Sequence, residues 1–344
     1  MPLPPDLIGN WKLCESSGFK AFADVGVDGD IKVGAGTNQD ANNLYTGAGN
    51  GPGGSLLDCG FDFNDTLGEY IELNNLQNFT NATICAWVKS SNQDGVTRIY
   101  FDDRDAAGSG MGLSRSLNKY ATLLFESGRK DGSIEPHDGT WHHIAGTYDG
   151  TFLRIFIDGV EEGSGVSAPG LTANPAQNAI IGRRSFGARA GDFGGIMADV
   201  RVYENDLTAA QISDIIDLAR PTFTTAASIS GTIEVGTELD AQYVLDDETL
   251  VTYAWQTSTD GLGGGLANVG TAKQYTPVAG DSGKYIRVAV TATSNALLSA
   301  SSTTAWSGPV ASGGGGPTVL KYQISAIESG NYPIPSAGLN GAMA

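Results

Sequence analysis

Hydrophobic and polar positions alternate in short runs along most of the chain, and glycine-containing turns separate these runs. The clearest case is residues 138–159, where two alternating runs flank a Tyr-Asp-Gly turn. Successive side chains on a strand point to opposite faces, so Leu153, Ile155 and Ile157 share one face. Two such runs joined by a tight turn predict a β-hairpin. Because its aliphatic face needs a covering sheet, the pattern predicts an all-β sandwich.

One stretch, residues 208–219, has a helical period instead. Thr208 suits the N-cap position and Gln211 stands three residues later, which is the spacing of a capping box. The apolar stripe of this helix consists of Ile212, Ile215, Ile216 and Ala219. Pro221 is expected to end the helix, because proline disfavours the helical conformation in the residue before it.

The composition divides the chain into three segments. Residues 1–220 hold the hairpin and the helix, and residues 221–311 alternate again but are richer in Thr, Ser and Ala. Residues 312–344 begin with Ser312 and four glycines, which predicts a flexible hinge. Residues 320–324 then alternate as one lone strand, whose backbone would need the edge of another sheet. We therefore expect an anchoring C-terminal arm, with a disordered tail as the competing interpretation.

Motifs in residues 1–220 resemble, in order, those of the laminin-G-like, concanavalin A-like jelly rolls. The matching stretches read NWKLCESSG, FTNATICAWVK, WHHIAGTYDG and FGGIMADVRVY. The resemblance covers almost the whole segment and implies a jelly-roll sandwich. We expect Trp87 and Trp141 to be core residues of this sandwich.

Residues 221–311 resemble the disulfide-free Ig-like repeats of bacterial surface and phage virion proteins. The resemblance rests on a Tyr-x-Trp strand ending at Trp255 and on a late D-x-G-x-Y corner at residues 281–285. The expected fold is therefore all-β. A concanavalin-A-like jelly-roll sandwich (1–220) is followed by an Ig-like β-sandwich with Trp255 in its core (221–311) and an extended C-terminal arm (312–344).

Charge and hydropathy exclude two classes of partner. The chain has 20 Lys and Arg against 38 Asp and Glu, a net charge of −18. Too few cations are present to neutralise a row of phosphates, which argues against nucleic-acid binding. No run approaches the roughly eighteen apolar residues that a membrane span needs. The opening MPLPPDLIGNWKL has neither the basic nor the apolar region of a secretory signal, so we expect none.

Three cysteines form no metal-binding spacing, and an odd number cannot pair completely. Cys85 lies in the apolar run ICAWV and is expected to be a buried free thiol. A disulfide between Cys14 and Cys59 stays open, because their spacing gives it no support.

The sequence argues against catalysis. Glycoside hydrolases with a jelly roll of this kind need two carboxylates on one strand, on the plan E-x-D-x-x-E, and this string does not occur. Glu69 and Glu72 form the nearest pair, but three residues apart they point to opposite strand faces. His142 and His143 also point to opposite faces and cannot readily bind one metal. We expect a protein that is not an enzyme and has no catalytic residues.

Acidic loops favour a cation site. Calcium prefers several hard oxygen ligands, which carboxylates and carbonyls supply. Members of the family that the chain resembles often hold a structural calcium at positions that correspond to Asp24 and Asp199. The resemblance therefore implies these two aspartates as metal ligands and calcium as a cofactor. The competing interpretation is solvated loop charge without an ion.

A bound glycan is expected at the loop rim of the first domain. Sugar sites need planar polar groups and an aromatic floor. The candidate ligand-binding residues are Tyr100, Asp102, Asp103, Arg104 and Arg183, with Tyr120 or Phe186 as further aromatic side chains.

These features predict a non-enzymatic virion surface protein, such as a bacteriophage capsid decoration or fibre protein, with a lectin-like module for adhesion. Its domains resemble those used outside cells, yet no export signal is seen, and release of particles by lysis reconciles the two. The expected partners are other virion proteins or further copies of the chain, bound through the arm as a homo-oligomer, and cell-surface glycans. The alternative is a secreted bacterial glycan-binding adhesin or the accessory module of a polysaccharide-degrading enzyme.

Overall fold

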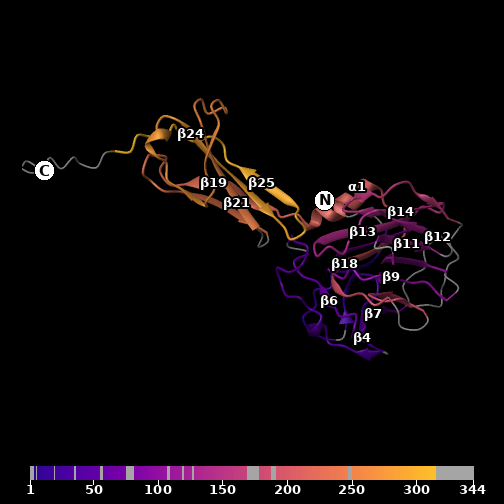
Figure 1. The fold of residues 1–344 in the computed structure, drawn as a ribbon. Coiled ribbons are helices and arrows are strands. Elements are labelled where there is room, and N and C mark those ends of the chain that lie inside the picture. Colours follow the sequence, from indigo (N-terminus) through magenta and orange to yellow (C-terminus); the bar gives the residue numbers. More distant parts are fainter. Residues whose placement is uncertain are drawn as a thin grey trace, which may run out of the picture.

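The computed structural model shows two β-sandwiches that follow one another along the chain and meet at one end of each (Figure 1). It describes residues 4–314 except 5, 19, 35, 55–56, 75–80, 107–108, 118–119, 126–127, 169–177, 187–190 and 247–249. The strand predicted at 320–324, and with it most of the predicted arm, lies outside the described residues. Within them, no helix is long and apolar enough to cross a membrane.

The first sandwich consists of two nine-stranded sheets with antiparallel pairing. Sheet I has the order β15-β14-β13-β8-β18-β1-β3, with β16 beside β14 and β6 beside β18. Its strands are β1 (Leu7–Trp11), β3 (Ala23–Val25), β6 (Phe61–Phe63), β8 (Ala82–Lys89), β13 (Trp141–Tyr148), β14 (Phe152–Ile157), β15 (Val160–Glu161), β16 (Val166–Ser167) and β18 (Gly195–Tyr203). Sheet II has the order β12-β11-β10-β9-β17-β7-β4-β2, with β5 beside β4. Its strands are β2 (Lys20–Ala21), β4 (Gly29–Val33), β5 (Thr37–Asn38), β7 (Glu69–Leu73), β9 (Arg98–Asp102), β10 (Met111–Arg115), β11 (Ala121–Phe125), β12 (Gly128–Asp131) and β17 (Ala179–Ile181).

The hairpin predicted from the alternating pattern is formed by β13 and β14. Thr147 pairs with Arg154 next to the turn, and the pairing continues along both strands. Leu153, Ile155 and Ile157 are at most 2% exposed and belong to the large core cluster of the first sandwich. The prediction of a covered aliphatic face is therefore confirmed.

A helix, α1 (Ala209–Ile216), covers part of the outer face of sheet I. The capping box is present: the Thr208 hydroxyl accepts from the Gln211 backbone N–H, and the Gln211 side chain accepts from the Thr208 backbone N–H. The apolar stripe of the helix packs in one cluster with Trp87 and Trp141. Both tryptophans are buried, as predicted, but they lie under the helix rather than between the two sheets.

The second sandwich pairs a three-stranded sheet with a four-stranded one. The first holds β19 (Phe223–Ser230), β20 (Leu239–Leu245) and β23 (Gln274–Tyr275), and the second holds β21 (Leu250–Ser258), β22 (Ala267–Gly270), β24 (Tyr285–Thr293) and β25 (Ser299–Thr303). Three short 3-10 turns, η1 (Ala41–Asn43), η2 (Asp217–Ala219) and η3 (Ala279–Asp281), complete the elements of the described chain.

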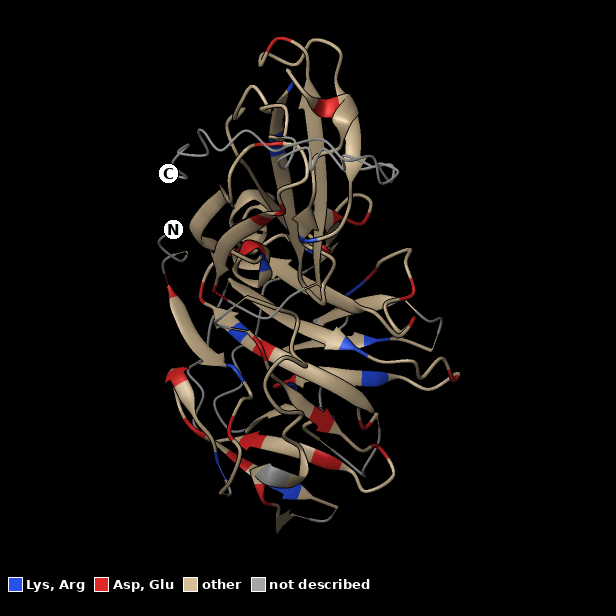
Figure 2. Cartoon of the chain, turned by 90° about the vertical axis from the view of Figure 1, so that its left-hand side faces the viewer, with Lys and Arg blue, Asp and Glu red and all other residues tan. Residues whose placement is uncertain are grey.

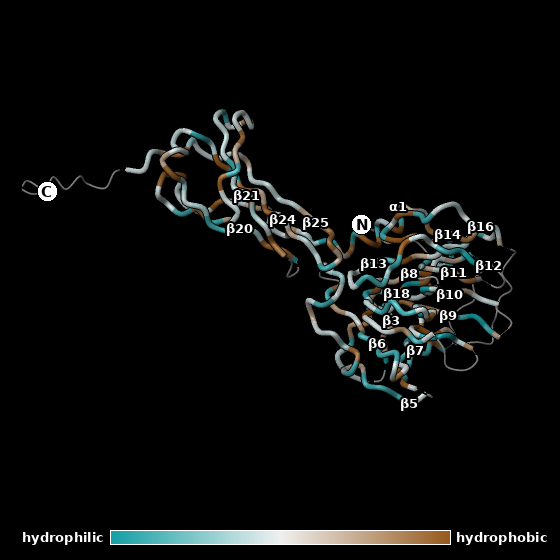
Figure 3. Tube along the Cα trace, in the orientation of Figure 1, coloured by the Kyte–Doolittle hydropathy of each residue, from teal (hydrophilic) through white to brown (hydrophobic). Residues whose placement is uncertain are grey.

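The second core is centred on Trp255. This side chain is fully buried, its ring stacks on Tyr275 with the centroids 5.8 Å apart, and its indole N–H donates to the carbonyl of Ala272. Along β24 buried and half-buried residues alternate, and hydrophobic and hydrophilic positions are interleaved along the strands of this sandwich (Figure 3). The prediction that Trp255 is a core residue is confirmed, whereas the Ig-like assignment stays a prediction.

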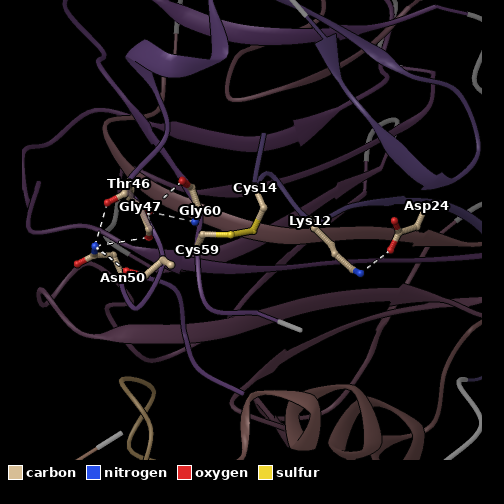
Figure 4. The surroundings of a disulfide bond; sticks show 9 residues. Lys12, Cys14, Asp24, Thr46, Gly47, Asn50, Cys59 and Gly60 are labelled. Carbon is tan, nitrogen blue, oxygen red and sulfur yellow. Dashed lines mark hydrogen bonds and ion pairs between the residues drawn. A yellow bond between two sulfur atoms is a disulfide. The ribbon is translucent and has the colours of Figure 1, made fainter. Parts of the chain in front are cut away.

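A disulfide joins Cys14 to Cys59, with the Cα atoms 5.4 Å apart (Figure 4). The structure thus answers the question that the cysteine spacing left open. Cys85 is a buried free thiol, as expected from its apolar surroundings. Burial raises the pKa of this thiol to about 12, so it remains protonated.

Hydrogen bonds connect the two sandwiches. The side-chain amide of Asn295 donates to the carbonyls of Gly49 and Gly51, each at 2.9 Å. The backbone N–H of Ala296 donates to the carbonyl of Pro52 at 2.8 Å. The end of the second sandwich thus rests on the loop of residues 49–54 of the first.

Candidate functional site

A groove of about 920 Å³ lies where β6 and β8 end and β18 begins, and its lining also includes Glu69 of β7 in sheet II. Three of its side chains come from neighbouring strands: Lys89 of β8 pairs with Ile196 of β18, and Ile196 pairs with Asp62 of β6. Residues directly opposite one another share a face of the sheet, so the three side chains stand in one row. The row continues to Trp141 of β13, which places the groove next to the helix-covered cluster.

Ion pairs and hydrogen bonds fix the loops that form the walls of this groove. The carboxylate of Asp65 lies 2.9 Å from Nη1 of Arg98 and accepts from the Asn92 side-chain amide at 3.2 Å. Arg98 is 8% exposed at its side chain, so the ion pair is largely shielded from solvent. The hydroxyl of Ser90 donates to the carbonyl of Gly194 at 2.7 Å. These contacts hold β8 and the strand ends around it in a defined position.

The carboxylates that line the groove differ in the hydrogen bonds that they accept. Glu69 accepts from the backbone N–H of Asn64 at 2.8 Å and from the side-chain amide of Gln39 at 3.0 Å. Asp62, by contrast, accepts no hydrogen bond at its carboxylate from any described residue, and partial burial raises its pKa. Lys89 is the only basic residue in the described lining, and its ammonium likewise contacts no described partner. Asp62 and Lys89 therefore keep hydrogen-bonding capacity toward the groove.

Part of the predicted loop rim is brought together on sheet II. Nε and Nη2 of Arg104 donate to the two carboxylate oxygens of Asp102 at 2.6 and 3.3 Å. Asp102 is fully buried and also accepts from the backbone N–H of Ser185. Burial raises the pKa of Asp102, and the Arg104 charge opposes that shift. The guanidinium of Arg104 lies 5.6 Å from the ring centroid of Phe186, the aromatic side chain that the sequence also put at the rim.

Tyr100 points into the protein instead, and Asp103 is half-buried. Tyr100 is fully buried and its hydroxyl lies 2.9 Å from Nε2 of His137, so its ring is not available as the floor of an exposed site. A carboxylate oxygen of Asp103 accepts from the Met111 backbone N–H at 2.5 Å. Burial raises the pKa of Asp103 to about 7. Strand β9 is buried on both faces, which alternation alone did not indicate.

Arg183 contacts other residues than the Asp102–Arg104 pair. Its guanidinium stacks over Tyr70 at 3.6 Å from the ring centroid and donates to the carbonyl of Gly34 at 2.9 Å. Tyr120 is 38% exposed. The predicted rim is thus divided between an Asp102–Arg104–Phe186 cluster and residues that stabilise other parts of the sandwich.

The two aspartates predicted to bind calcium each face a cation of the protein. A carboxylate oxygen of Asp24 lies 2.9 Å from the Lys12 ammonium (Figure 4). Asp199 is fully buried, and both of its oxygens lie 2.9 Å from Nε of Arg201. Burial raises the pKa of Asp199, Arg201 and Lys12 lower it, and Asp24 raises it further, so the four charges form one electrostatic group.

This arrangement does not resemble the oxygen cage that calcium prefers, because protein cations already contact both carboxylates. Calcium binding would require Lys12 and Arg201 to move away from Asp24 and Asp199. The calcium site therefore stays a prediction.

Comparisons with known proteins place the first sandwich. Residues 64–213 match the family model described as the concanavalin A-like lectin/glucanases superfamily. They include the groove strands β8 and β18 and the hairpin of β13 and β14. The resemblance seen in the sequence is thereby confirmed, and the first sandwich is called the concanavalin A-like sandwich below. No match was found among curated proteins.

Two solved structures illustrate the similarity. Domain 4 of AbnA, an extracellular arabinanase from Geobacillus stearothermophilus solved with arabinotriose, is 19% identical, with 62% of this chain and 98% of that domain covered and a TM-score of 0.45. The sialidase of Trypanosoma rangeli is 18% identical, with 63% of this chain covered and a TM-score of 0.42. The similar region spans 33% of the sialidase chain.

The groove of the concanavalin A-like sandwich was not predicted from the sequence. One signal was present: Cys85, Trp87 and Lys89 alternate along FTNATICAWVK and therefore share the outer face of β8. The other two members of the row, Asp62 and Ile196, are more than a hundred residues apart in sequence. Only the register of β6, β18 and β8 brings them together.

Proposed function

We propose that the concanavalin A-like sandwich is a glycan-binding module and that the groove of Asp62, Ile196 and Lys89 is its binding site. The carrying observation is the row itself, in which a carboxylate and an ammonium flank an aliphatic side chain. A sugar ring has apolar C–H patches and hydroxyls at its edge, so an apolar floor between an acceptor and a donor suits it. Asn64 and Asn92 in the same lining add planar amides.

We further propose that the groove binds without hydrolysis. Glycoside hydrolysis generally uses two carboxylates, one as acid and one as base or nucleophile. Asp65 is held by Arg98 and Asn92, and Glu69 is held by Asn64 and Gln39. Asp62 is then the one lining carboxylate, among the described residues, without a hydrogen-bond donor.

The superfamily match supports one of the two functions weighed from the sequence more than the other. A glycan-binding adhesin, or an accessory module of a polysaccharide-degrading enzyme, fits a lectin/glucanase fold directly. The disulfide between Cys14 and Cys59 fits an oxidising compartment outside the cytosol. A virion surface protein has no support from the match or from the described residues. We therefore propose the adhesin or accessory module as the context of the binding site.

A glycan array followed by titration calorimetry tests this proposal. Wild-type protein should bind at least one glycan that contains neutral sugar units. Asp62→Asn and Lys89→Met should each weaken this binding roughly tenfold to a hundredfold, because each loses a charge-assisted hydrogen bond of about 1.5–3 kcal/mol. The matched control is Asp206→Asn, which changes an exposed aspartate outside the groove and should leave affinity unchanged. An array without hits, or full affinity in both groove variants, contradicts the proposal. Release of reducing ends from a bound glycan contradicts the absence of hydrolysis.

A further inference from the structure

The loop on which the second sandwich rests, residues 49–54, lies beside the disulfide between Cys14 and Cys59, and it is called the junction loop below (Figure 4). Hydrogen bonds join Thr46, which precedes the loop, to Gly60, which follows Cys59. The Thr46 backbone N–H donates to the Gly60 carbonyl at 3.1 Å, and the Gly60 N–H donates to the Thr46 hydroxyl at 3.1 Å. The base of the junction loop is therefore attached to the segment that holds Cys59.

Gly51 links the contact between the sandwiches to this segment. Its carbonyl accepts from the side-chain amide of Asn295 at 2.9 Å, and its N–H donates to the carbonyl of Asp58 at 2.8 Å. A Cβ atom at Gly51 would lie 2.3 Å from the backbone nitrogen of Cys59 and 2.2 Å from the carbonyl oxygen of Leu57. The two backbones thus lie in direct contact, so a displacement of Cys59 also displaces the acceptor of the Asn295 hydrogen bond.

The disulfide attaches this segment to the sheet. Cys14 follows β1, which pairs with β18 in sheet I, and the neighbouring Leu13 is fully buried in the core. Residues 57–60, by contrast, belong to no strand. The S–S bond therefore holds a segment outside the sheets, 45 residues away in sequence, against a fixed strand end.

We propose that the Cys14–Cys59 disulfide is a redox-sensitive constraint on the junction between the two sandwiches. When the bond is formed, the junction loop holds the second sandwich in one orientation. When the bond is reduced, the contacts of Asn295 and Ala296 open and the two sandwiches reorient independently. This inference does not depend on the groove binding glycans.

A dithiol supplies the two electrons of the reduction. One of its thiolates attacks the sulfur of Cys14, which is half-buried, whereas Cys59 is 5% exposed. The S–S bond breaks, and Cys59 leaves as a thiolate that takes up a proton. The second thiolate of the dithiol then displaces Cys14, which also takes up a proton, and the dithiol ends as a disulfide.

The constraint couples the junction to the redox state of the compartment. Thiol systems keep cysteines reduced in the cytosol, and disulfides persist outside it. We infer that the junction is loose in a reducing compartment and becomes fixed on transfer to an oxidising one. The third cysteine, Cys85, is a fully buried free thiol in β8 and does not compete for pairing in the folded chain.

Amide hydrogen exchange of the full chain, followed residue by residue by NMR with and without dithiothreitol, tests the proposal. The N–H of Ala296 donates to the carbonyl of Pro52 across the junction at 2.8 Å, so its exchange reports on junction opening. It should exchange about tenfold faster, or more, in the reduced protein. The N–H of Ile286 donates to the carbonyl of Ser307 within the second sandwich at 2.8 Å and should stay within about twofold.

Two variants separate the disulfide from other effects of the reductant. The double variant Cys14→Ser and Cys59→Ser should show fast exchange at Ala296 without dithiothreitol. Cys85→Ser is the matched control, because it removes a thiol and keeps the disulfide, and it should respond to dithiothreitol as the wild type does. If the double variant does not fold, reduction and reoxidation of the wild type decide, and reoxidation should restore slow exchange.

Exchange at Ala296 that is the same in the oxidised and reduced proteins overturns the proposal. The N–H of Asp158, which donates to the carbonyl of His143 within the first sandwich at 2.9 Å, distinguishes junction opening from unfolding. Equal acceleration at Ala296, Ile286 and Asp158 also overturns the proposal, because the disulfide would then stabilise the fold rather than the junction. A folded double variant with slow exchange at Ala296 overturns it as well.

Discussion

The two sandwiches of this chain differ in what they bury. Among the described residues, the concanavalin A-like sandwich buries eleven acidic, basic or histidine side chains: Glu69, Arg98, Asp102, Arg115, Lys130, His137, His143, Glu162, Asp192, Asp199 and Arg201. The second sandwich buries one, Asp281, beside a core of Leu239, Trp255 and the valines of β24. Figure 2 shows acidic and basic positions spread through the strands and loops of the first sandwich.

This difference favours the first sandwich as the location of binding sites. A buried charge is costly unless it is paired, so a fold that keeps many of them uses the pairs to fix loops in position. Arg115 illustrates this use: it binds both carboxylate oxygens of Glu135 at 2.9 Å and donates to the carbonyls of Asp94 and Val96. The groove of Asp62, Ile196 and Lys89 lies in the sandwich with such networks. The second sandwich is stabilised mainly by apolar packing, which suits a spacer or a platform.

The largest expected effect separates the two cores. Trp255→Ala and Trp87→Ala each remove a side chain that is at most 1% exposed, and each should lower the stability of its own sandwich by about 3–5 kcal/mol. Differential scanning calorimetry should show one unfolding transition for each sandwich. Trp255→Ala should shift the transition of the second sandwich, and Trp87→Ala should shift that of the first. A shift of both transitions by the same amount in either variant would mean that the chain unfolds as one unit and that the comparison fails.

The pH dependence of stability should also separate the sandwiches, because all three histidines lie in the first one. Burial lowers the pKa of His143 to about 3 and that of His137 to about 4. Below the unfolded-state pKa of about 6.5, the unfolded chain binds protons that these folded histidines do not bind. Each therefore destabilises the first sandwich by roughly 1.4 kcal/mol per pH unit as the pH falls from about 6.5 toward its folded pKa.

His142 has the opposite effect on how the stability of the first sandwich changes with pH. Its hydrogen bond to Asp158, at 2.7 Å, raises its pKa, so its contribution is present below the unfolded-state pKa and is lost as the pH rises through the folded pKa. Asp103 acts in the same direction as His142, because burial raises its folded pKa to about 7. The histidine contributions are therefore measured as differences from the wild type in melting curves between pH 8 and 5, in which the transition of the second sandwich should change little. Relative to the wild type, the first sandwich of His143→Phe should lose less stability as the pH falls, and that of His142→Phe should lose more. A second transition that follows pH as strongly as the first would contradict the assignment.

The all-β fold, the hairpin, the capped helix and the buried tryptophans could be predicted from the sequence, because alternation and capping are local patterns. Alternation shows which residues share a face of a strand, but it does not show which element covers that face. Trp87 and Trp141 were therefore expected in the core of the sandwich, although α1 covers them. Tyr100 was expected at the rim as part of an aromatic floor, but β9 is buried on both faces. The row of Asp62, Ile196 and Lys89 depends on long-range register, and the pairing of Cys14 with Cys59 depends on the path of a loop, which no local pattern encodes.

The smallest expected effect concerns the connection between the two sandwiches. Asn295→Ala removes two hydrogen bonds, to the carbonyls of Gly49 and Gly51, and leaves both cores intact. At about 0.5–1.5 kcal/mol for each hydrogen bond, neither transition should move by more than a few degrees. The two sandwiches should nevertheless sample more orientations, so small-angle scattering should report a broader distribution of overall dimensions.

Asn268→Ala is the matched control for this effect, since Asn268 accepts from Gln256 within the second sandwich and contributes no hydrogen bond to the junction. Its scattering should equal that of the wild type. If Asn295→Ala also scatters like the wild type, the side-chain hydrogen bonds of Asn295 do not hold the junction. The contact between the sandwiches would then rest on the hydrogen bond from the Ala296 N–H to the Pro52 carbonyl and on the close packing at Gly53. A Cβ atom at Gly53 would come within 2.4 Å of the Ser294 Cβ, so Gly53→Ala should then open the junction where Asn295→Ala did not.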